Sequence, residues 1–411
     1  MTKNRRRASA LAVALGAAIS LVACGSDDGG DSGGEGGTAS LQVLIASSGD
    51  AETNAVKEAA AAWSEESGTE VEVLPAQDIN QQLGQAFAGG NPPDVFYVDA
   101  ARFGDYAEQG SLFPYGDQIE DADDFYEPLR ETFTYEGQLY CAPKDFSTLG
   151  LIINTAAWSA AGLTDADVPT DWNTLQSVAQ KLTTGTQKGL VIGDTNDRIG
   201  AFFVQNGGWI LNEDGTEVTA DSSENVEALT YVKGLLDAGV AAYPKEVDAG
   251  WGGEAFGLGK AAMTIEGNWI KGAIKNDYPD VQYLVAPLPE GSAGQGTLLF
   301  TQCYGIAAQS ENQAAAVELV NYLTSAETQL ANADAFGVMP SRQSVEADYV
   351  AKYPEDAAFV AGGEYGQGPV NLPGFDAVMS DYNSQLAELK TKEPQAILAQ
   401  LQTNGEAALG G

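Results

Sequence analysis

The chain has 411 residues with 20 basic and 58 acidic side chains, so its formal net charge is −38, and neither nucleic acid nor anionic lipid is an expected partner. It contains no histidine, which removes the usual general base and the commonest metal ligand and excludes Ser-His-Asp, Cys-His and zinc-hydrolase chemistry. We expect no metal and no cofactor.

Residues 1–23 have the pattern of a cleavable signal peptide. Basic residues at positions 3 to 7 precede an apolar stretch, 8–23, that is too short for an ordinary membrane span. The stretch ends in Leu-Val-Ala-Cys, which resembles the bacterial lipobox and implies cleavage before Cys24 and lipidation of that cysteine. The mature protein is then expected at the outer face of the cytoplasmic membrane, held by lipid alone. Secretory export is the default, and Arg6-Arg7 leaves the twin-arginine route open.

Residues 24–40 are expected to form a flexible tether. The segment is rich in glycine, serine and acidic residues and has no large apolar side chain to bury until the chain nears residue 41. At the usual rise per residue its extended reach is about 40 Å. It would hold a folded body clear of the membrane surface.

The rest of the chain is longer than one hydrophobic core usually serves, so two lobes are expected. The first elements read as a strand, a helix, a strand, a helix and a strand. Because alternation of this kind is typical of a parallel sheet covered by helices, the pattern predicts an α/β fold. These elements lie near residues 41–46, 56–63, 71–73, 79–87 and 94–98.

Helical spacing of apolar residues continues toward the C-terminus. A helix is expected over 175–182, capped by Thr170, and another over 316–323. Apolar residues from Phe375 to Leu389 trace one long helical face, and Pro394 is expected to open a last helix.

Four motifs, in this order and spacing, resemble the bacterial extracellular solute-binding proteins of the maltose-binding family. They are Asn-Pro-Pro-Asp-Val at 91–95, Ala-Pro-Lys-Asp-Phe-Ser-Thr-Leu-Gly-Leu at 142–151, Gly-Lys-Ala-Ala-Met at 259–263 leading to Glu-Gly-Asn-Trp at 266–269, and Gly-Val-Met-Pro-Ser-Arg at 337–342. The resemblance implies a periplasmic-binding-protein-like fold, in which two α/β lobes are joined by hinge crossovers and enclose a ligand cleft.

The resemblance also implies where the lobes divide. Lobe 1 would comprise residues 41–143 and 303–338, and lobe 2 would comprise residues 144–302 and 339–411. The chain would cross between them near Lys144, Thr301 and Pro340.

The function that the resemblance implies is that of a carbohydrate receptor for an ABC importer, which is not an enzyme and is expected to be a monomer. Ligand contacts made by both lobes would exist only in the closed form, so the sugar would favour closure and the permease would recognise the closed form. Three alternatives stay open: a lipid-anchored glycosidase with a carboxylate pair, a binding protein for another solute such as a peptide or polyol, and a surface protein for adhesion or sensing.

A sugar site needs aromatic platforms for C–H faces and fixed polar groups for hydroxyls. Trp63, Trp158 and Trp172 lie on or beside helical apolar patterns and are expected in the core. Three other tryptophans lie in turns or glycine-rich loops and are candidate platforms, with packing against a core edge as the alternative for each: Trp209, Trp251 and Trp269. In the resembling family the turn that ends at Trp269 supplies a ring that stacks on sugar.

The candidate polar contacts lie at the implied crossings, after the third strand and in the turn before Trp269. For each of them the alternative is a solvated loop charge or a helix cap. They are Asp99, Lys144, Asp145, Ser147, Glu266, Asn268 and Arg342.

Two cysteines remain once Cys24 is lipidated, an even pair in an exported protein. In the resembling family the two crossing segments run side by side, which implies that Cys141 and Cys303 approach to disulfide distance. The alternative is two separate buried thiols.

Overall fold

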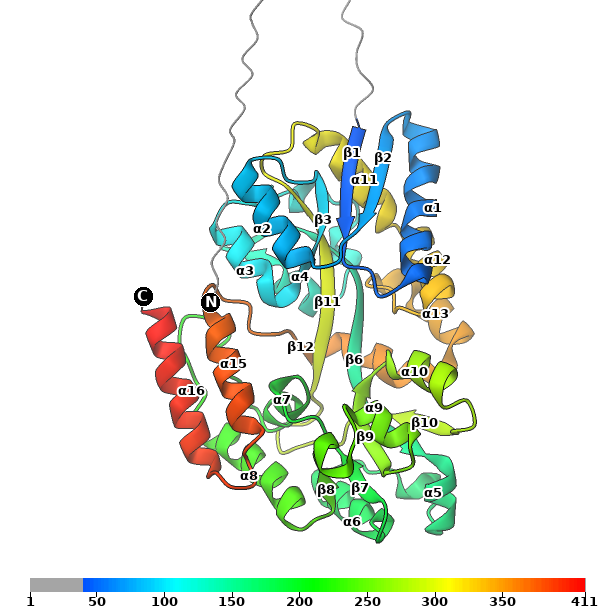
Figure 1. The fold of residues 1–411 in the computed structure, drawn as a ribbon, viewed down its shortest axis with the longest axis vertical. Coiled ribbons are helices and arrows are strands. Elements are labelled where there is room, and N and C mark those ends of the chain that lie inside the picture. The colour runs from blue at the N-terminus through cyan, green and yellow to red at the C-terminus, as the bar shows by residue number, and fades with distance from the viewer. Residues whose placement is uncertain (1–39, 411) are drawn as a thin grey trace, which may run out of the picture. The chain divides into compact units, whose positions relative to one another are not determined.

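The computed structural model describes residues 40–410 (Figure 1). The expected signal peptide, Cys24 and the expected tether up to residue 39 lie outside the described residues. In the described part no helix combines the length and apolar character that a membrane crossing requires.

The N-terminal elements form the predicted β-α-β-α-β unit. They are β1 (Ser40–Ile45), α1 (Asp50–Ser67), β2 (Glu70–Pro75), α2 (Ile79–Gly89) and β3 (Val95–Asp99). Strand β1 pairs in parallel with both β2 and β3, which confirms the predicted parallel α/β arrangement. Strand β3 is apolar and buried up to Asp99, as expected for an inner strand of a sheet covered by helices, whereas the edge strand β2 carries the exposed Glu70.

The next elements complete this side of the molecule and lead to the crossing. They are α3 (Ala100–Glu108), α4 (Glu127–Thr132), β4 (Thr134–Tyr135) and β5 (Gln138–Leu139).

Two long strands run through the middle of the molecule (Figure 1). They are β6 (Ala142–Asn154) and β11 (Thr297–Ile306), which pair antiparallel with Cys303 opposite Pro143 and Leu299 opposite Thr148. They connect the strands on both sides into one sheet of order β2-β1-β3-β11-β6-β9-β7-β8.

The chain between the two long strands forms the other side of the molecule. Strand β9 pairs antiparallel with β6, while β7 pairs in parallel with β8 and β9, so this side is also α/β. Its elements are α5 (Thr155–Ala160), α6 (Trp172–Leu182), β7 (Lys188–Val191), α7 (Asn196–Gln205), α8 (Ser223–Asp237), β8 (Ala241–Ala242), α9 (Gly252–Gly257), β9 (Ala261–Gly267), α10 (Ile270–Asp277) and β10 (Tyr283–Ala286).

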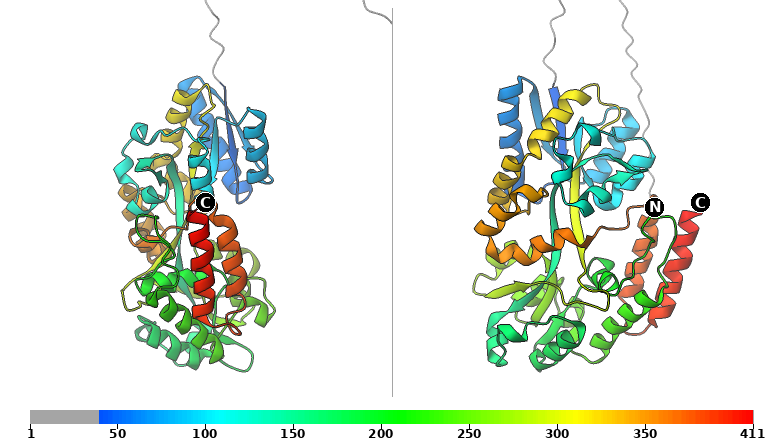
Figure 2. Two further views of the ribbon diagram at one scale, coloured as in Figure 1. Left: turned by 90° about the vertical axis from the view of Figure 1, so that its left-hand side faces the viewer. Right: turned by 180° about the vertical axis from the view of Figure 1, so that it is seen from behind.

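After β11 the chain returns to the first side and then crosses again. Helices α15 and α16 lie side by side on the second side, in both views of Figure 2. The elements are α11 (Gln313–Leu323), α12 (Ala326–Phe336), α13 (Glu346–Lys352), α14 (Ala357–Ala361), β12 (Gly366–Gln367), α15 (Phe375–Leu386) and α16 (Pro394–Leu409).

Two helix boundaries differ from the prediction. Helix α6 is capped by Asp171 and not by Thr170, because the Asp171 carboxylate accepts from the amide of Thr174 and the Thr174 hydroxyl accepts from the amide of Asp171. The face that begins at Phe375 is not one helix as far as Leu389. Helix α15 ends at Leu386, and the Lys233 ammonium donates to the carbonyl of Leu389 at 3.0 Å outside it.

The buried apolar residues form three clusters. One gathers residues between 41 and 142 with residues 303–323, and a second gathers residues between 149 and 298 with residues 370–401. A third combines residues from 126 to 360 around the crossing. Trp63 and Trp158 are buried, which confirms that they belong to the core. The division of the lobes at particular residues stays a prediction.

Candidate functional site

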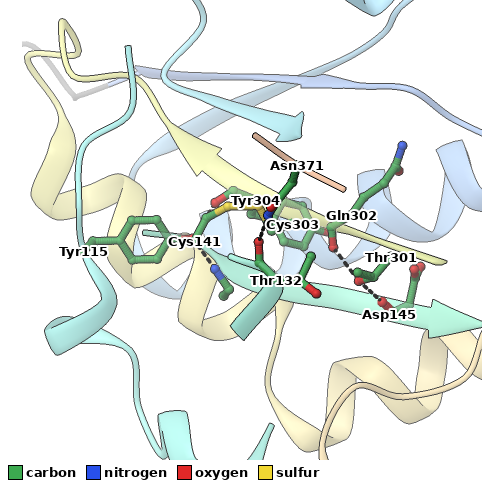
Figure 3. Close-up of a disulfide and its surroundings, with 10 residues drawn as sticks. Tyr115, Thr132, Cys141, Asp145, Thr301, Gln302, Cys303, Tyr304 and Asn371 are labelled. Carbon is green, nitrogen blue, oxygen red and sulfur yellow. Dashed lines mark hydrogen bonds between the residues drawn. A yellow bond between two sulfur atoms is a disulfide. The ribbon is translucent and has the colours of Figure 1, made fainter. Parts of the chain in front are cut away.

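A disulfide joins the two crossing strands (Figure 3). It links Cys141, just before β6, to Cys303 of β11, with Cα atoms 5.7 Å apart, and both residues are buried. Next to it, the Tyr115 hydroxyl donates to the Tyr304 carbonyl and accepts from the Ala142 amide at 2.9 Å. The disulfide therefore lies in a buried, hydrogen-bonded part of the crossing.

A cavity of about 670 Å³, called here the inter-lobe cavity, lies beside β11 and is lined from both sides of the crossing. Figure 1 shows α3 on one side of this region and α7 and α15 on the other. Its wall is formed by Asp99 to Ala101, Asn196, Asp197, Trp209, Leu298 to Thr301, Gln367 to Val370, Asp376, Met379, Ser380, Asn383 and Ser384.

Three helices begin at this cavity, and each has an aspartate at its start. Asp99 caps α3 and accepts from the amide of Ala101 at 2.9 Å, while Asp197 and Asp376 lie in the first turns of α7 and α15. The positive ends of the three helix dipoles offset part of this negative charge. Burial, with the nearby charges of Asp197 and Asp376, raises the pKa of Asp99. The result is a wall with three carboxylates, of which that of Asp376 is already paired with the Arg102 guanidinium of α3.

Trp269 lies beside the wall of the inter-lobe cavity, where its neighbours Gly267 and Phe300 position its ring. It is 36% exposed, and its ring lies against Gly267, where a Cβ atom would approach the ring to 2.2 Å. Its edge meets Phe300 of the cavity wall, with ring centroids 5.1 Å apart. The glycine of the Glu-Gly-Asn-Trp motif therefore makes room for the tryptophan.

Glu266 and Arg198 hold Trp269 in position. The buried Glu266 carboxylate accepts from the Arg198 guanidinium at 2.7 Å and from the indole nitrogen of Trp269 at 3.1 Å. The guanidinium carbon of Arg198 lies 5.0 Å from the centroid of the Trp269 ring. Burial raises the pKa of Glu266, although the charge of Arg198 opposes that shift. Glu266 thus lies outside the cavity wall and fixes the positions of Arg198 and Trp269.

Lys144 and Asp145 form a buried ion network with Glu52 of α1. The Lys144 ammonium contacts the carboxylates of Asp145 and Glu52, the latter at 3.1 Å, and lies 4.7 Å from the centroid of the Tyr97 ring. Glu52 also accepts from the amide and the hydroxyl of Ser48. Lys144 and Asp145 are expected ligand contacts that the structure places in a network internal to the protein and not in the wall of the inter-lobe cavity.

Ser147 and Asn268 connect the turn before Trp269 to the crossing. The amide of Asn268 donates to the Ser147 hydroxyl at 3.2 Å, and the Asn268 side chain donates to the Gly337 carbonyl at 3.3 Å. Both side chains are buried and lie outside the cavity wall.

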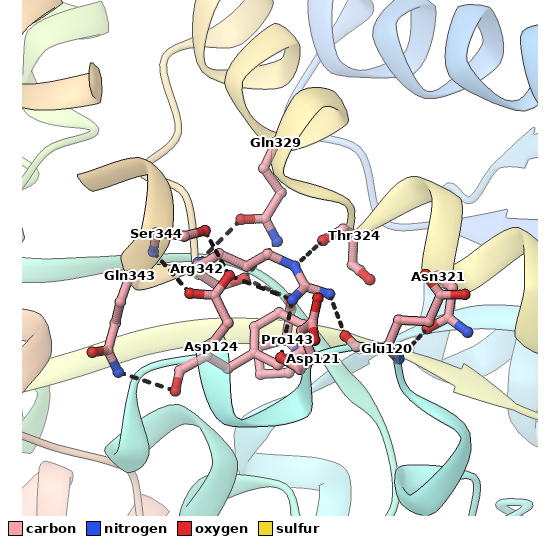
Figure 4. Close-up of polar contacts among 12 residues, drawn as sticks. Glu120, Asp121, Asp124, Pro143, Asn321, Thr324, Gln329, Arg342, Gln343 and Ser344 are labelled. Carbon is pink, nitrogen blue, oxygen red and sulfur yellow. Dashed lines mark hydrogen bonds and ion pairs between the residues drawn. The ribbon is translucent and has the colours of Figure 1, made fainter. Parts of the chain in front are cut away.

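Arg342 is placed in a structural network away from the cavity (Figure 4). Its guanidinium donates to the carbonyls of Thr324, Asp121 and Glu120 at 2.6, 3.1 and 2.9 Å and lies over the Phe125 ring. The residue is 4% exposed. We therefore assign it a structural role in place of the expected ligand contact.

The other two candidate tryptophans differ in their positions. Trp209 lines the inter-lobe cavity, and its carbonyl is fixed by the Asn225 side chain at 2.8 Å. The Trp251 ring lies over Gly253, where a Cβ atom would approach it to 2.1 Å, and packs on the third core cluster. Of the ten expected ligand residues, only Asp99 and Trp209 lie in the cavity wall.

The fold and the cavity define a two-lobed binding protein with a site lined from both sides of its crossing strands. Residues 58–361 match the protein family described as bacterial extracellular solute-binding protein, and the chain belongs to that family. It is therefore a solute-binding protein and not an enzyme, which removes the glycosidase alternative.

Several known proteins are similar to this chain. The diacetylchitobiose binding protein DasA of Streptomyces coelicolor is 25% identical over 397 residues, which cover 92% of each chain. The GacH receptor of Streptomyces glaucescens, whose structures include a complex with acarbose, is 25% identical with a TM-score of 0.76, covering 91% of this chain and 99% of that one. The cyclic alpha-maltosyl-1,6-maltose binding protein of Arthrobacter globiformis has a TM-score of 0.81 at 20% identity, covering 91% and 100% of the two chains. This likeness confirms the fold.

Proposed function

We propose that the chain is the carbohydrate receptor of an ABC importer and that it binds its sugar in the inter-lobe cavity. The observation that carries this proposal is the composition of the cavity wall, where carboxylates from three helix starts face the same space as Trp209 and Phe300. Carboxylates accept hydrogen bonds from hydroxyl groups, and aromatic rings cover the C–H faces of a sugar. The names of DasA and of the Arthrobacter globiformis protein are those of sugar-binding proteins.

Transport would follow from closure of the two lobes. In this proposal residues 41–143 with 303–338 move as one body and residues 144–302 with 339–411 as the other. Asp99 lies on the first body, while Asp197 and Trp209 lie on the second, so a sugar that contacts all three favours the closed form. The permease would then take the sugar from the closed receptor.

A thermal-shift screen tests the proposal. The purified protein is heated with mono-, di- and oligosaccharides, and with polyols and short peptides as other solute classes. A sugar at a hundred times its dissociation constant is expected to add about 2.7 kcal/mol to the free energy of unfolding. If only a peptide or a polyol stabilises the protein, the ligand belongs to that class of solute and the carbohydrate proposal is wrong.

Replacing Trp269 by alanine is expected to weaken sugar binding by about 1 to 3 kcal/mol, because it removes an aromatic surface beside Phe300. Titration calorimetry with a sugar that stabilises the protein measures the change. The conservative variant Trp269→Phe keeps a ring and should recover part of the affinity. If the folded alanine variant binds as tightly as the wild type, Trp269 belongs to the edge of the core and not to the site.

We also propose that the receptor is lipidated at Cys24 and held by the tether that follows. Mass spectrometry of protein extracted from membranes should find a diacylglyceryl group at an N-terminal Cys24. The variant Cys24→Ser should lose the lipid and leave the membrane fraction. An unmodified N-terminus at another residue would reject the anchor.

A further inference from the structure

Helices α3 and α15 meet beside the inter-lobe cavity, although they belong to different cores. Phe103 and Ala107 of α3 are buried in the first core cluster, whereas Phe375 and Tyr382 of α15 are buried in the second. In Figure 1 the two helices lie on opposite sides of the crossing, with α3 above and α15 below. A contact between them therefore joins the two sides of the molecule directly and not through the crossing strands.

Two side chains of α3 make this contact. The Arg102 guanidinium forms an ion pair with Asp376, in the first turn of α15, and another with Asp105 of its own helix at 3.4 Å. The Asp105 carboxylate also accepts from the amide of Gly374 at 3.3 Å. Three charged groups and one backbone amide thus form a continuous network between the two sides, called here the clasp.

The clasp supplies a group that the start of α15 lacks. Its N-cap residue is Gly374, which has a positive φ of 76° and carries no side chain that could accept from the first amides of the helix. Asp105 brings a carboxylate from the other side of the molecule to this place, where the dipole of α15 also favours a negative charge. The helix start is therefore completed only while the two sides stay in contact.

The backbones of the two sides also approach closely at the clasp. A Cβ atom on Gly104 would come within 1.9 Å of the Asn371 carbonyl oxygen, so only a glycine fits there. The Asn371 side chain donates to the Thr132 carbonyl of α4 at 2.8 Å, as Figure 3 shows. These contacts hold the chain before α15 against the first side of the molecule and keep Arg102 within reach of Asp376.

We propose that the clasp holds the two lobes together while no ligand is bound and that it must break before they separate. The inference rests on the lobe motion in the proposed function, which places α3 in one moving body and α15 in the other. All partners in the clasp belong to the chain itself, so its formation requires no ligand. Because the side chains of Arg102 and Asp376 are 37% and 50% exposed, the clasp should be weak and sensitive to salt.

The test measures the separation of the lobes in the mature protein without ligand. Spin labels are attached at Gln85→Cys on α2 and Ala407→Cys on α16, two exposed positions on helices that lie on opposite sides of the crossing. Cys24→Ser removes the other reactive thiol, and the remaining two cysteines are held in the buried disulfide. Pulsed electron spin resonance then gives the distribution of distances between the labels.

Four variants are compared in this labelled protein. Arg102→Gln and Asp105→Asn each break the clasp, while Arg102→Lys keeps the positive charge. Arg130→Gln is the matched control, because it also breaks an exposed pair of an arginine with an aspartate, Asp123, but both partners lie in the first lobe. A salt titration of the wild type repeats the test without any substitution in the clasp.

The wild type is expected to show one predominant distance. Arg102→Gln and Asp105→Asn should each raise the population at longer distances about threefold, which is the effect of losing one partly exposed ion pair. About 1 M sodium chloride should produce the same shift in the wild type and no further shift in Arg102→Gln. Arg102→Lys should stay close to the wild type, and Arg130→Gln should not differ from it.

Three results would overturn the clasp: a wild type that already has the longer distance, a distribution that neither Arg102→Gln nor salt changes, or an equal shift in Arg130→Gln. No sugar enters this experiment, so each of these results leaves the proposed carbohydrate site intact. Conversely, a protein that no carbohydrate stabilises would refute the proposed function without changing the outcome here.

Discussion

Loss of the disulfide between Cys141 and Cys303 is expected to lower the free energy of unfolding by about 5 kcal/mol. The bond closes a loop across a sequence separation of 162 residues. In the chain-entropy model, closing a loop of that length lowers the entropy of the unfolded chain, which raises the free energy of unfolding by about this amount. Because both cysteines are buried beside the paired strands β6 and β11, the folded protein should change little. Equilibrium denaturation with and without reductant measures the difference.

The double variant Cys141→Ala/Cys303→Ala is the control for this experiment. It should be as unstable as the reduced wild type, apart from a small packing loss, and it should not respond to reductant. Thiol counting on denatured, unreduced mature protein should find no free thiol at these positions. Two free thiols, or a wild type whose stability ignores reductant, would show that the bond does not form.

The second large effect is expected from Lys144→Met, which should lower the free energy of unfolding by about 3 to 5 kcal/mol at pH 7. The methionine fills a similar volume but leaves the carboxylates of Glu52 and Asp145 buried without a counter-charge. Denaturant unfolding of the variant and the wild type gives the difference. The matched control is Lys352→Met, which breaks the exposed pair with Asp334 and should change stability little.

The loss caused by Lys144→Met should become smaller as the pH falls. Burial tends to raise the pKa of Glu52, but the charge of Lys144 and the hydrogen bonds from Ser48 outweigh it, so the pKa is lower than that of an ordinary glutamate. In the wild type this carboxylate therefore stabilises the fold above its unfolded pKa, and the contribution is lost as the pH falls through the folded pKa. Burial raises the pKa of Asp145 despite Lys144, so its charge costs stability at neutral pH, and protonation removes that cost.

In the variant both carboxylates lack Lys144, so the pKa of Glu52 should no longer be lowered by that charge and the pKa of Asp145 should rise further. Protonation should then relieve the repulsion between the two carboxylates at a higher pH than in the wild type. Unfolding measured at pH 7 and again near pH 4 should show the gap between variant and wild type narrowing. A gap that stays constant would mean that Lys144 stabilises the fold by packing and not by charge.

Local sequence signals predicted the fold well. The β1-to-β3 unit followed from apolar runs separated by helical periodicity. Lys144 and Thr301, two of the three implied crossing positions, lie on the paired long strands β6 and β11, while the division into lobes stays a prediction. Periodicity failed at α15, because Leu389 is buried like a helical residue although the helix has already ended at Leu386. An apolar repeat reports which side chains are buried and not where the backbone hydrogen bonds stop.

The candidate site was harder to predict, because its pairings are not local. The Lys144 ammonium, an expected ligand contact, pairs with Glu52, which is 92 residues away in the sequence. The Arg342 guanidinium, another expected contact, donates to the carbonyl of Thr324. In the other direction, Asp197 and Asp376 were missed because each reads as an ordinary acidic residue in the first turn of a helix. Both residues are carboxylates at the start of a helix that follows a strand. That pattern indicates a common site only once the structure shows that the helices begin at the same cavity.

Arg198 and Phe300 were missed for a related reason. Phe300 lies in the middle of an apolar strand and reads as a core residue, yet it forms part of the cavity wall. Arg198 meets Glu266, which is 68 residues away in the sequence. The sequence did indicate the turn that carries Trp269, because its Glu-Gly-Asn-Trp motif contains both the partner of the indole and the glycine beneath the ring.

The central claim, that a carbohydrate is held between the two lobes, is tested most directly by a crystal structure of the protein with the sugar that stabilises it most. The account predicts density for the sugar in the inter-lobe cavity, with hydrogen bonds to Asp99 from one side of the crossing and to Asp197 from the other, and with Trp209 against a ring face. Density outside this cavity, or contacts from one side of the crossing only, would contradict it.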